Sequence, residues 1–119
     1  MSAVFDDIAS VTLRSAADSL ALRQRVIANN IANINTPHFL ANRVLFEQAL
    51  GRAVEQGTPG EPTAAVRASL EPTRMDGNNV NLDHEVLANV DTGLRYSLML
   101  RALDDKFGLN TTVIRGSAA

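Results

Sequence analysis

The apolar residues near the N-terminus recur at a spacing typical of one long amphipathic helix. Four large aliphatic side chains stand seven residues apart: Leu13, Leu20, Ile27 and Ile34. This spacing places them on one face, and it predicts a helix from about Ala3 to Asn33. Thr36-Pro37 ends the pattern, because the residue before a proline is sterically disfavoured in the α region.

A second helical pattern runs from Leu82 to about Arg115. Its seam positions alternate by four and three residues: Val86, Asn89, Gly93, Tyr96, Leu100, Leu103, Phe107, Asn110 and Ile114. Asn81 is a suitable N-cap, and Asp83 and Glu85 place negative charge in the first turn. We expect the N-terminal seam to face Tyr96, Leu100, Leu103, Phe107 and Ile114. Together the two segments predict an all-α fold whose long terminal helices pack as an antiparallel coiled-coil pair.

The segment between the two helices has no sustained periodicity. Apolar residues after His38 allow a short helix that ends at Gly57. Residues 56–75 carry three of the four prolines and few large side chains, which predicts a mobile loop. Asp76-Gly77-Asn78-Asn79 then predicts a turn. The expected organisation is a helix over 1–36, an irregular segment over 37–80 and a helix over 81–119, with both helices in one coiled-coil domain.

Composition narrows the possible functions. The net charge is −2 without a basic stripe, so nucleic acid and anionic membranes are not expected partners. There are no cysteines, which removes disulfides, thiolate metal sites and cysteine nucleophiles. Apolar runs of at most three residues are too short for a transmembrane helix, and the first residues lack the features of a cleavable signal peptide. Without a nucleophile elbow or phosphate loop, we expect no enzyme activity, no cofactor, no metal and no small-molecule substrate.

Both helical segments also carry apolar residues away from their seams. These are Val4, Val11, Leu22 and Val26 in the first segment, and Leu87, Leu94 and Leu98 in the second. Two helices alone share a single seam, so the extra apolar residues favour contact with more than one neighbour. The pattern favours a larger helical assembly. A self-contained bundle, with a third helix from the middle segment, stays open as the alternative.

Asparagine is a mediocre helix former, so the run that contains Asn29, Asn30 and Asn33 needs a reason beyond propensity. These amides either form hydrogen bonds between helices or mark the fraying end of one. The stretch Ile27–Phe39, IANNIANINTPHF, resembles the N-terminal motif of the bacterial flagellar axial proteins, the family of rod, hook and hook-associated subunits. His38 stands where this family usually has glycine, which adopts positive φ at lower cost.

A second stretch, Arg74–Glu85 (RMDGNNVNLDHE), is similar to the motif of the proximal rod members of that family. The chain is short and lacks the large middle domain of hook and distal rod subunits. The two motifs together imply a structural subunit of the proximal rod, which polymerises through its terminal helices and transmits torque. The alternative is another flagellar adaptor or assembly protein that uses the same type III export route.

The resemblance also implies partners, location and packing residues. The expected partners are further copies of this chain, other rod subunits, the membrane (MS) ring with its rod adaptor, and the flagellar type III export apparatus. The expected location is the basal-body rod across the periplasm, reached without a cleaved signal. The residues expected to pack subunits are Leu13, Leu20, Ile27, Asn29, Asn30, Ile31, Asn33, Ile34, Thr36, Pro37, Phe39, Asp76, Gly77, Asn78, Val80, Tyr96, Leu100, Leu103, Phe107 and Ile114.

Overall fold

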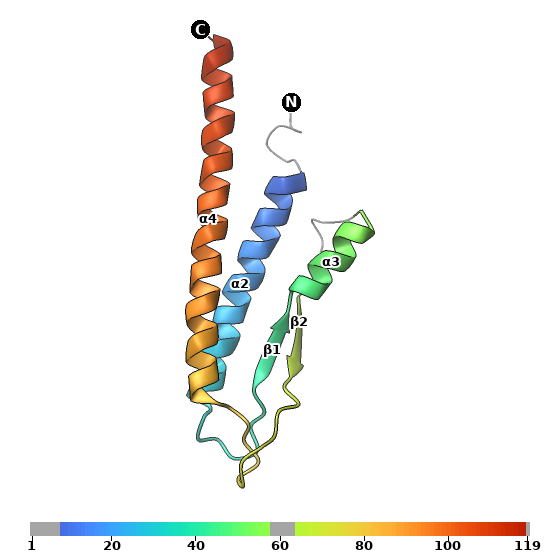
Figure 1. Ribbon diagram of the computed structural model, residues 1–119, viewed down its shortest axis with the longest axis vertical. Coiled ribbons are helices and arrows are strands. Elements are labelled where there is room, and N and C mark those ends of the chain that lie inside the picture. Colours follow the sequence, from blue (N-terminus) through green and yellow to red (C-terminus); the bar gives the residue numbers. More distant parts are fainter. Residues whose placement is uncertain (1–7, 58–63, 119) are drawn as a thin grey trace.

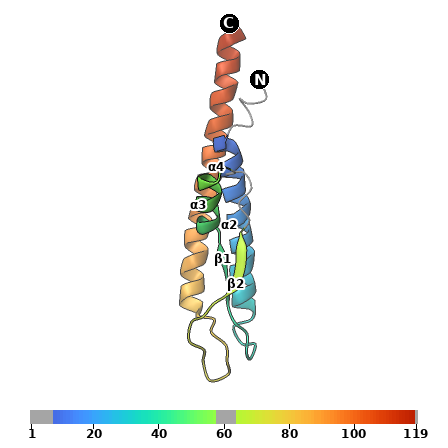
Figure 2. The same ribbon diagram turned by 90° about the vertical axis from the view of Figure 1, so that its right-hand side faces the viewer.

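The computed structural model describes residues 8–57 and 64–118, which form three helices and one two-stranded sheet. The elements are α2 (Ile8–Ala32), β1 (Asn42–Leu45), α3 (Glu47–Glu55), β2 (Ala65–Ala68) and α4 (Leu82–Ala118). The molecule is elongated, with principal extents of 69, 28 and 14 Å (Figures 1 and 2). The first residues of the expected N-terminal helix, 3–7, lie outside the described residues.

The long helices α2 and α4 lie side by side, and they make the most extensive contact among the described elements. Helix α2 runs toward the turns at the lower end of Figure 1, and α4 runs back from those turns. The expected long terminal helices are therefore present. Since α4 has 37 residues and α2 has 25, α4 extends beyond the first described turn of α2. None of the described helices is long and apolar enough to cross a membrane.

The contact between α2 and α4 includes a site at which α4 presents small residues. Leu20 and Ile27 of α2 are buried. The facing side of α4 includes Gly93, where an added Cβ would lie only 3.6 Å from Gln24 Nε2. Thr92, beside this glycine, is also buried. Small side chains let two helix axes approach closely, so this face packs in preference to the bulkier ones.

Part of the expected seam is therefore wrong for the single chain. Leu100 and Phe107 are 42% and 43% exposed, whereas Tyr96 and Leu103 are half-buried. The expected seam shares Gly93, Tyr96 and Leu103 with the face that packs, whereas Leu100 and Phe107 lie on its exposed edge. The side chain of Ile114 lies outside the described ones.

The middle segment forms a small hairpin beside α2, which corrects the all-α expectation. Strands β1 and β2 pair antiparallel, with Val44 opposite Val66. Val44 and Phe46 are buried with Ala16 of α2, in a core that also contacts partly buried Leu22, Val26, Leu50, Ala64 and Met99. The loop expected over 56–75 is wrong at β2, and its residues 58–63 lie outside the described part. Strands of four residues are too short to show alternation, and each needs its partner to form.

Helix α3 lies where a short helix was expected and is tied to both long helices. It is followed by Gln56 at the C-cap and by Gly57, whose φ of 76° suits a helix end. Arg23 of α2 donates to both carboxylate oxygens of Glu47, at 2.8 and 2.7 Å. Arg95 of α4 lies 3.6 Å from the same carboxylate. The hydrogen bond from Arg23 holds the pKa of Glu47 below its ordinary value.

Candidate functional site

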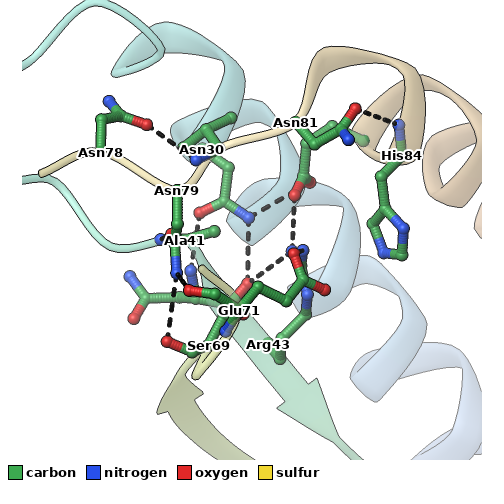
Figure 3. Close-up of polar contacts among 12 residues, drawn as sticks. Asn30, Ala41, Arg43, Ser69, Glu71, Asn78, Asn79, Asn81 and His84 are labelled. Atoms are coloured by element: carbon green, nitrogen blue, oxygen red, sulfur yellow. Dashed lines mark hydrogen bonds and ion pairs between the residues drawn. The ribbon is translucent and has the colours of Figure 1, made fainter. Parts of the chain in front are cut away.

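The two sequence motifs meet where α2 ends and α4 begins. Their polar side chains gather there with one arginine of β1, and they bind one another or nearby backbone groups (Figure 3). We call this cluster the polar junction: Asn30, Arg43, Arg74, Asn78, Asn79 and Glu85. Asn30, Asn78 and Glu85 are fully buried, and Asn79 nearly so. Buried polar groups are costly unless they are hydrogen-bonded, so the partners of each side chain define what the junction does.

Asn78 caps the turn that follows the C-terminal end of α2. Its Nδ2 donates to the carbonyl oxygens of Asn33, Ile34 and Thr36 at 2.9, 3.1 and 2.9 Å. Its Oδ1 accepts from the backbone N–H of Val80 at 2.7 Å. These carbonyls belong to the turn that follows α2, where the chain has left the regular helical hydrogen-bond pattern. It fixes the end of α2 to the segment that leads into α4.

Asn30 and Glu85 link α2, β1 and α4. The Asn30 amide exchanges two 2.9 Å hydrogen bonds with the backbone N–H and C=O of Asn42. It also donates to Glu85 Oε2 at 3.2 Å, while Arg43 Nη1 donates to Glu85 Oε1 at 2.5 Å. A buried charge is tolerated only when it is paired and hydrogen-bonded in good geometry. This trio therefore selects one alignment of the three elements.

Asn79 and Arg74 attach the hairpin and the turns to the same point. Asn79 Oδ1 accepts from the N–H of Ala41 at 2.7 Å, and its Nδ2 donates to the carbonyls of Ser69 and Glu71. Figure 3 shows Asn79 between Ala41 and Ser69, which precede β1 and follow β2. Arg74 donates to the carbonyls of Val80 and Ile34, both at 2.6 Å. Side-chain amides and a guanidinium thus tie the hairpin and the turns to the ends of the long helices.

Two tight turns pack against each other next to the junction. His38 has a φ of +64° and donates its N–H to the carbonyl of Asp76 at 2.9 Å. Gly77 has a φ of +82°, and a Cβ added there would lie 2.5 Å from His38 Nδ1. Only glycine fits this position, because the space and the positive φ both exclude a side chain. His38 holds the left-handed conformation that glycine adopts more easily.

The structure distinguishes among the three asparagines of the first motif. Asn30 forms the expected bond between helices, through Glu85. Asn33 instead donates to the carbonyl of Asn29 at 2.8 Å within its own turn, and Asn29 is exposed. Both interpretations of the asparagine run therefore apply, each to a different residue. The other predicted residues divide similarly: Val80 is buried, Ile31, Ile34 and Phe39 are half-buried, and Thr36, Pro37 and Asp76 are exposed.

Several junction residues were missing from the expected packing set. Asn79 and Glu85 lie inside the second motif, so the motif itself was a sufficient signal for them. Arg74 is the first residue of that same motif. Arg43 carried no sequence signal, because an arginine in an irregular segment is normally interpreted as a solvated charge. Only the fold shows that Arg43 faces the carboxylate of Glu85, across forty-two residues of chain.

A shallow groove lies beside the junction. It has a volume of about 370 Å³, and Val26, Ile27 and Val44 are among its apolar lining residues. On its rim, Glu47 is paired with Arg23 and Asp91 with Arg95. Among the described residues there is no cluster of three histidine or acidic side chains that could hold a metal. Polar groups of the groove and junction bind mainly one another, which suits a structural role.

Comparison with known proteins agrees with this arrangement. A family model described as "Flagella basal body rod protein" matches residues 12–39, which contain the first motif. The chain is 34% identical to the flagellar basal body rod protein FlgB of Borrelia hermsii, over 68% of this chain and 76% of that protein. It is 31% identical to FlgB of Cereibacter sphaeroides, over 84% of this chain and 91% of that protein. This chain belongs to the FlgB family of flagellar basal body rod proteins.

Membership of the FlgB family extends over nearly the whole length of some relatives. FlgB of Bacillus subtilis is 27% identical over 87% of this chain and 91% of its own length. The chain is therefore a structural subunit of the flagellar basal-body rod and not an enzyme. It resides in the basal body, in association with other rod components.

Proposed function

We propose that this chain builds the proximal part of the rod by polymerising through α2 and α4, which pair as an antiparallel coiled coil. The buried Leu20 and Ile27, seven residues apart on α2, support this pairing because they occupy equivalent positions of a heptad. The opposite directions of α2 and α4 in Figure 1 agree with it. The assembled tube would act as the drive shaft that transmits torque.

The polar junction gives each subunit the stiffness that a drive shaft needs. Hydrogen bonds to neutral groups contribute about 0.5–1.5 kcal/mol each, and those to charged groups about 1.5–3 kcal/mol. Because the junction ties both helices and the hairpin at one point, sliding α2 along α4 breaks several of these bonds at once. Directional bonds resist such sliding better than apolar contacts, which tolerate small shifts. We propose that the buried members of the expected packing set serve this internal role.

The exposed members of the set are proposed to contact neighbouring subunits. The single observation that carries the proposal is the number of large apolar side chains that α4 leaves exposed, including Leu87, Leu94 and Leu98. A soluble monomer rarely exposes such a row, and an extended row marks an interaction surface. We propose that the neighbours are copies of this chain and other rod subunits. At the base of the rod, the MS ring and its adaptor are the proposed contacts.

The proposed route to the rod is the flagellar type III export apparatus, without a cleaved signal. The competing proposal is an adaptor or assembly protein that uses the same route without remaining in the rod. To separate the two, an epitope-tagged copy is expressed in cells that lack the native gene, and basal bodies are purified. A rod subunit restores swimming and copurifies with the basal bodies. Recovery of the protein only from the medium, with swimming restored, would favour the adaptor instead.

A further inference from the structure

Strand β1 uses its outer edge within the chain. The backbone N–H and C=O of Asn42 bind the side chain of Asn30, and the carbonyl of Val44 accepts from Arg23 Nη2 at 3.0 Å. These backbone groups therefore point away from β2. Along an antiparallel strand, residues that bond to the partner strand alternate with residues whose N–H and C=O point to the other side. Asn42 and Val44 are of the second kind.

Strand β2 has an outer edge that no described element pairs with. Ala68 lies opposite Asn42 and Val66 opposite Val44, so the N–H and C=O groups of both also point away from the other strand. None of these backbone groups has a hydrogen-bond partner among the described residues. In Figure 2, β2 lies in front of α2 with no helix or strand before it. The edge therefore offers donors and acceptors in the positions that a further strand requires.

A small pocket lies beside this edge, between the hairpin and α3. It has a volume of about 130 Å³ and is lined by Leu45, Gln48, Ala49, Arg52, Ala65 and Arg67. Both arginines are exposed, and neither guanidinium forms a hydrogen bond or an ion pair within the described part of the chain. Two guanidinium groups without a counter-charge at one pocket favour a carboxylate, which can accept parallel hydrogen bonds from each of them.

The side chains along the edge determine which residues an added strand must carry. Val66 is 47% exposed, and it shares a face of the hairpin with Val44, which is buried. Arg67 lies on the other face, at the pocket. Successive residues of a strand point to opposite faces, so an added residue that covers Val66 has neighbours that point toward the pocket. An acidic residue next to an apolar one therefore fits both faces.

We propose that the outer edge of β2 binds an extended segment of another rod component in which acidic and apolar residues alternate, with a carboxylate held by Arg52 and Arg67. The β2 edge of a second copy fits poorly. When Val66 of each copy bonds to Ala68 of the other, the two Arg67 side chains lie directly opposite, and like charges in that position repel. Only the identity of the partner as a rod component rests on the proposed function. The surface itself is separate from α2 and α4.

Peptide binding to the purified chain tests this edge directly. The probe is acetyl-Glu-Val-Glu-Val-Glu-Val-amide, and the control peptide carries lysine in place of each glutamate. Hydrogen exchange of single amides is followed by nuclear magnetic resonance. At saturation, the glutamate peptide is expected to slow the exchange of the Val66 and Ala68 amides by about fivefold or more, because both become hydrogen-bonded. The lysine peptide is expected to leave them unchanged.

A proline variant removes one donor from the edge. Val66→Pro deletes an N–H that points outward, and proline is tolerated in an edge strand at such a position. The melting temperature of the variant is therefore expected to stay close to that of wild type. The glutamate peptide should no longer protect the Ala68 amide. Unchanged protection of Ala68 would show that the peptide does not add to this edge.

A charge-reversal variant keeps the proposal testable if the proline variant fails to fold. Arg52→Glu combined with Arg67→Glu changes two exposed side chains, and it is expected to weaken binding of the glutamate peptide by about tenfold or more. The same variant should bind the lysine peptide. The matched control combines Arg25→Glu with Arg101→Glu, which gives the same net charge through exposed residues of α2 and α4. Equal weakening in this control would overturn the carboxylate site.

Three further outcomes would overturn the proposal. The first is equal binding of both peptides to wild type, and the second is dimerisation of wild type that Val66→Pro abolishes, which would assign the edge to a second copy. In cells that lack the native gene, the Arg52/Arg67 variant is expected to reduce the swimming zone by about twofold or more. Normal swimming would show that the rod does not use the edge. Absence of the wild-type tagged chain from basal bodies would instead refute the rod function, while the peptide result would stand.

Discussion

Replacing Asn78 should clearly lower the stability of the chain, because its bonds join the turn after α2 to the segment that leads into α4. The side chain has two N–H donors shared among three carbonyls, and its Oδ1 accepts from Val80. Asn78→Ala therefore loses about three hydrogen bonds, and at about 1 kcal/mol each the expected loss is about 3 kcal/mol. The carbonyl of Ile34 keeps a partner in Arg74 Nη2, at 2.6 Å, which limits the cost.

The assay is urea unfolding of the purified chain, followed by circular dichroism at the helix band. A loss of about 3 kcal/mol is a large part of the 5–15 kcal/mol typical of a domain, so the midpoint should fall clearly. Asn78→Asp should be worse than Asn78→Ala, since its carboxylate would face three carbonyl oxygens without a donor. The matched control is Asn29→Ala at the exposed end of α2, with an expected loss below about 0.5 kcal/mol. Equal midpoints for Asn78→Ala and Asn29→Ala would refute the capping role.

Three further predictions follow from single contacts. His38→Gly should raise the melting temperature slightly, because a non-glycine residue at φ +64° costs about 1 kcal/mol; a lower melting temperature would contradict the strain argument. The hydrogen bond from Arg23 lowers the pKa of Glu47 in the folded chain, which adds to the free energy of unfolding. This stabilisation is fully present above the pKa that Glu47 has in the unfolded chain, and it is lost as the pH falls through its pKa in the folded chain. Between pH 7 and pH 3, the free energy of unfolding in urea should therefore fall less for Glu47→Gln than for wild type. An equal fall would exclude the Arg23–Glu47 pair as a cause of the loss of stability in acid. Leu100→Ala and Phe107→Ala should abolish swimming while expression stays normal, because both side chains are exposed and proposed to contact neighbours; normal swimming would count against that contact.

Local sequence determined the elements whose signals lie within a few residues. The seven-residue spacing of Leu20 and Ile27 places both in the core, and Thr36-Pro37 follows the end of α2 closely. Asn81 caps α4 as predicted, with its Oδ1 accepting from the N–H of His84 at 3.2 Å. These features depend on one residue and its immediate neighbours, through backbone sterics or a single hydrogen bond. Because these local preferences depend little on the rest of the fold, the sequence was enough to predict these features.

The choice of packing face on α4 was decided only in three dimensions. Large apolar residues occur on almost every side of this helix, so its repeat fits more than one packing face. The expected seam ran through Leu100 and Phe107, but the structure exposes both and buries Glu85 and Thr92. Close approach to α2 favours small residues, and the carboxylate of Glu85 gains two hydrogen bonds there. Neither effect can be predicted from the sequence of α4 alone, because both depend on contacts with other elements.

The hairpin and the polar junction depended on contacts between distant parts of the chain. Each strand has four residues and becomes stable only through its partner and through the apolar surface of α2. Asn78 reaches three carbonyls more than forty residues away, and Arg43 neutralises Glu85 across a similar distance. The sequence alone determined two long helices, a turn and the residues that mark a rod subunit. The tertiary structure decided which groups are buried together, because hydrogen bonds and close packing are properties of pairs of residues and not of single positions.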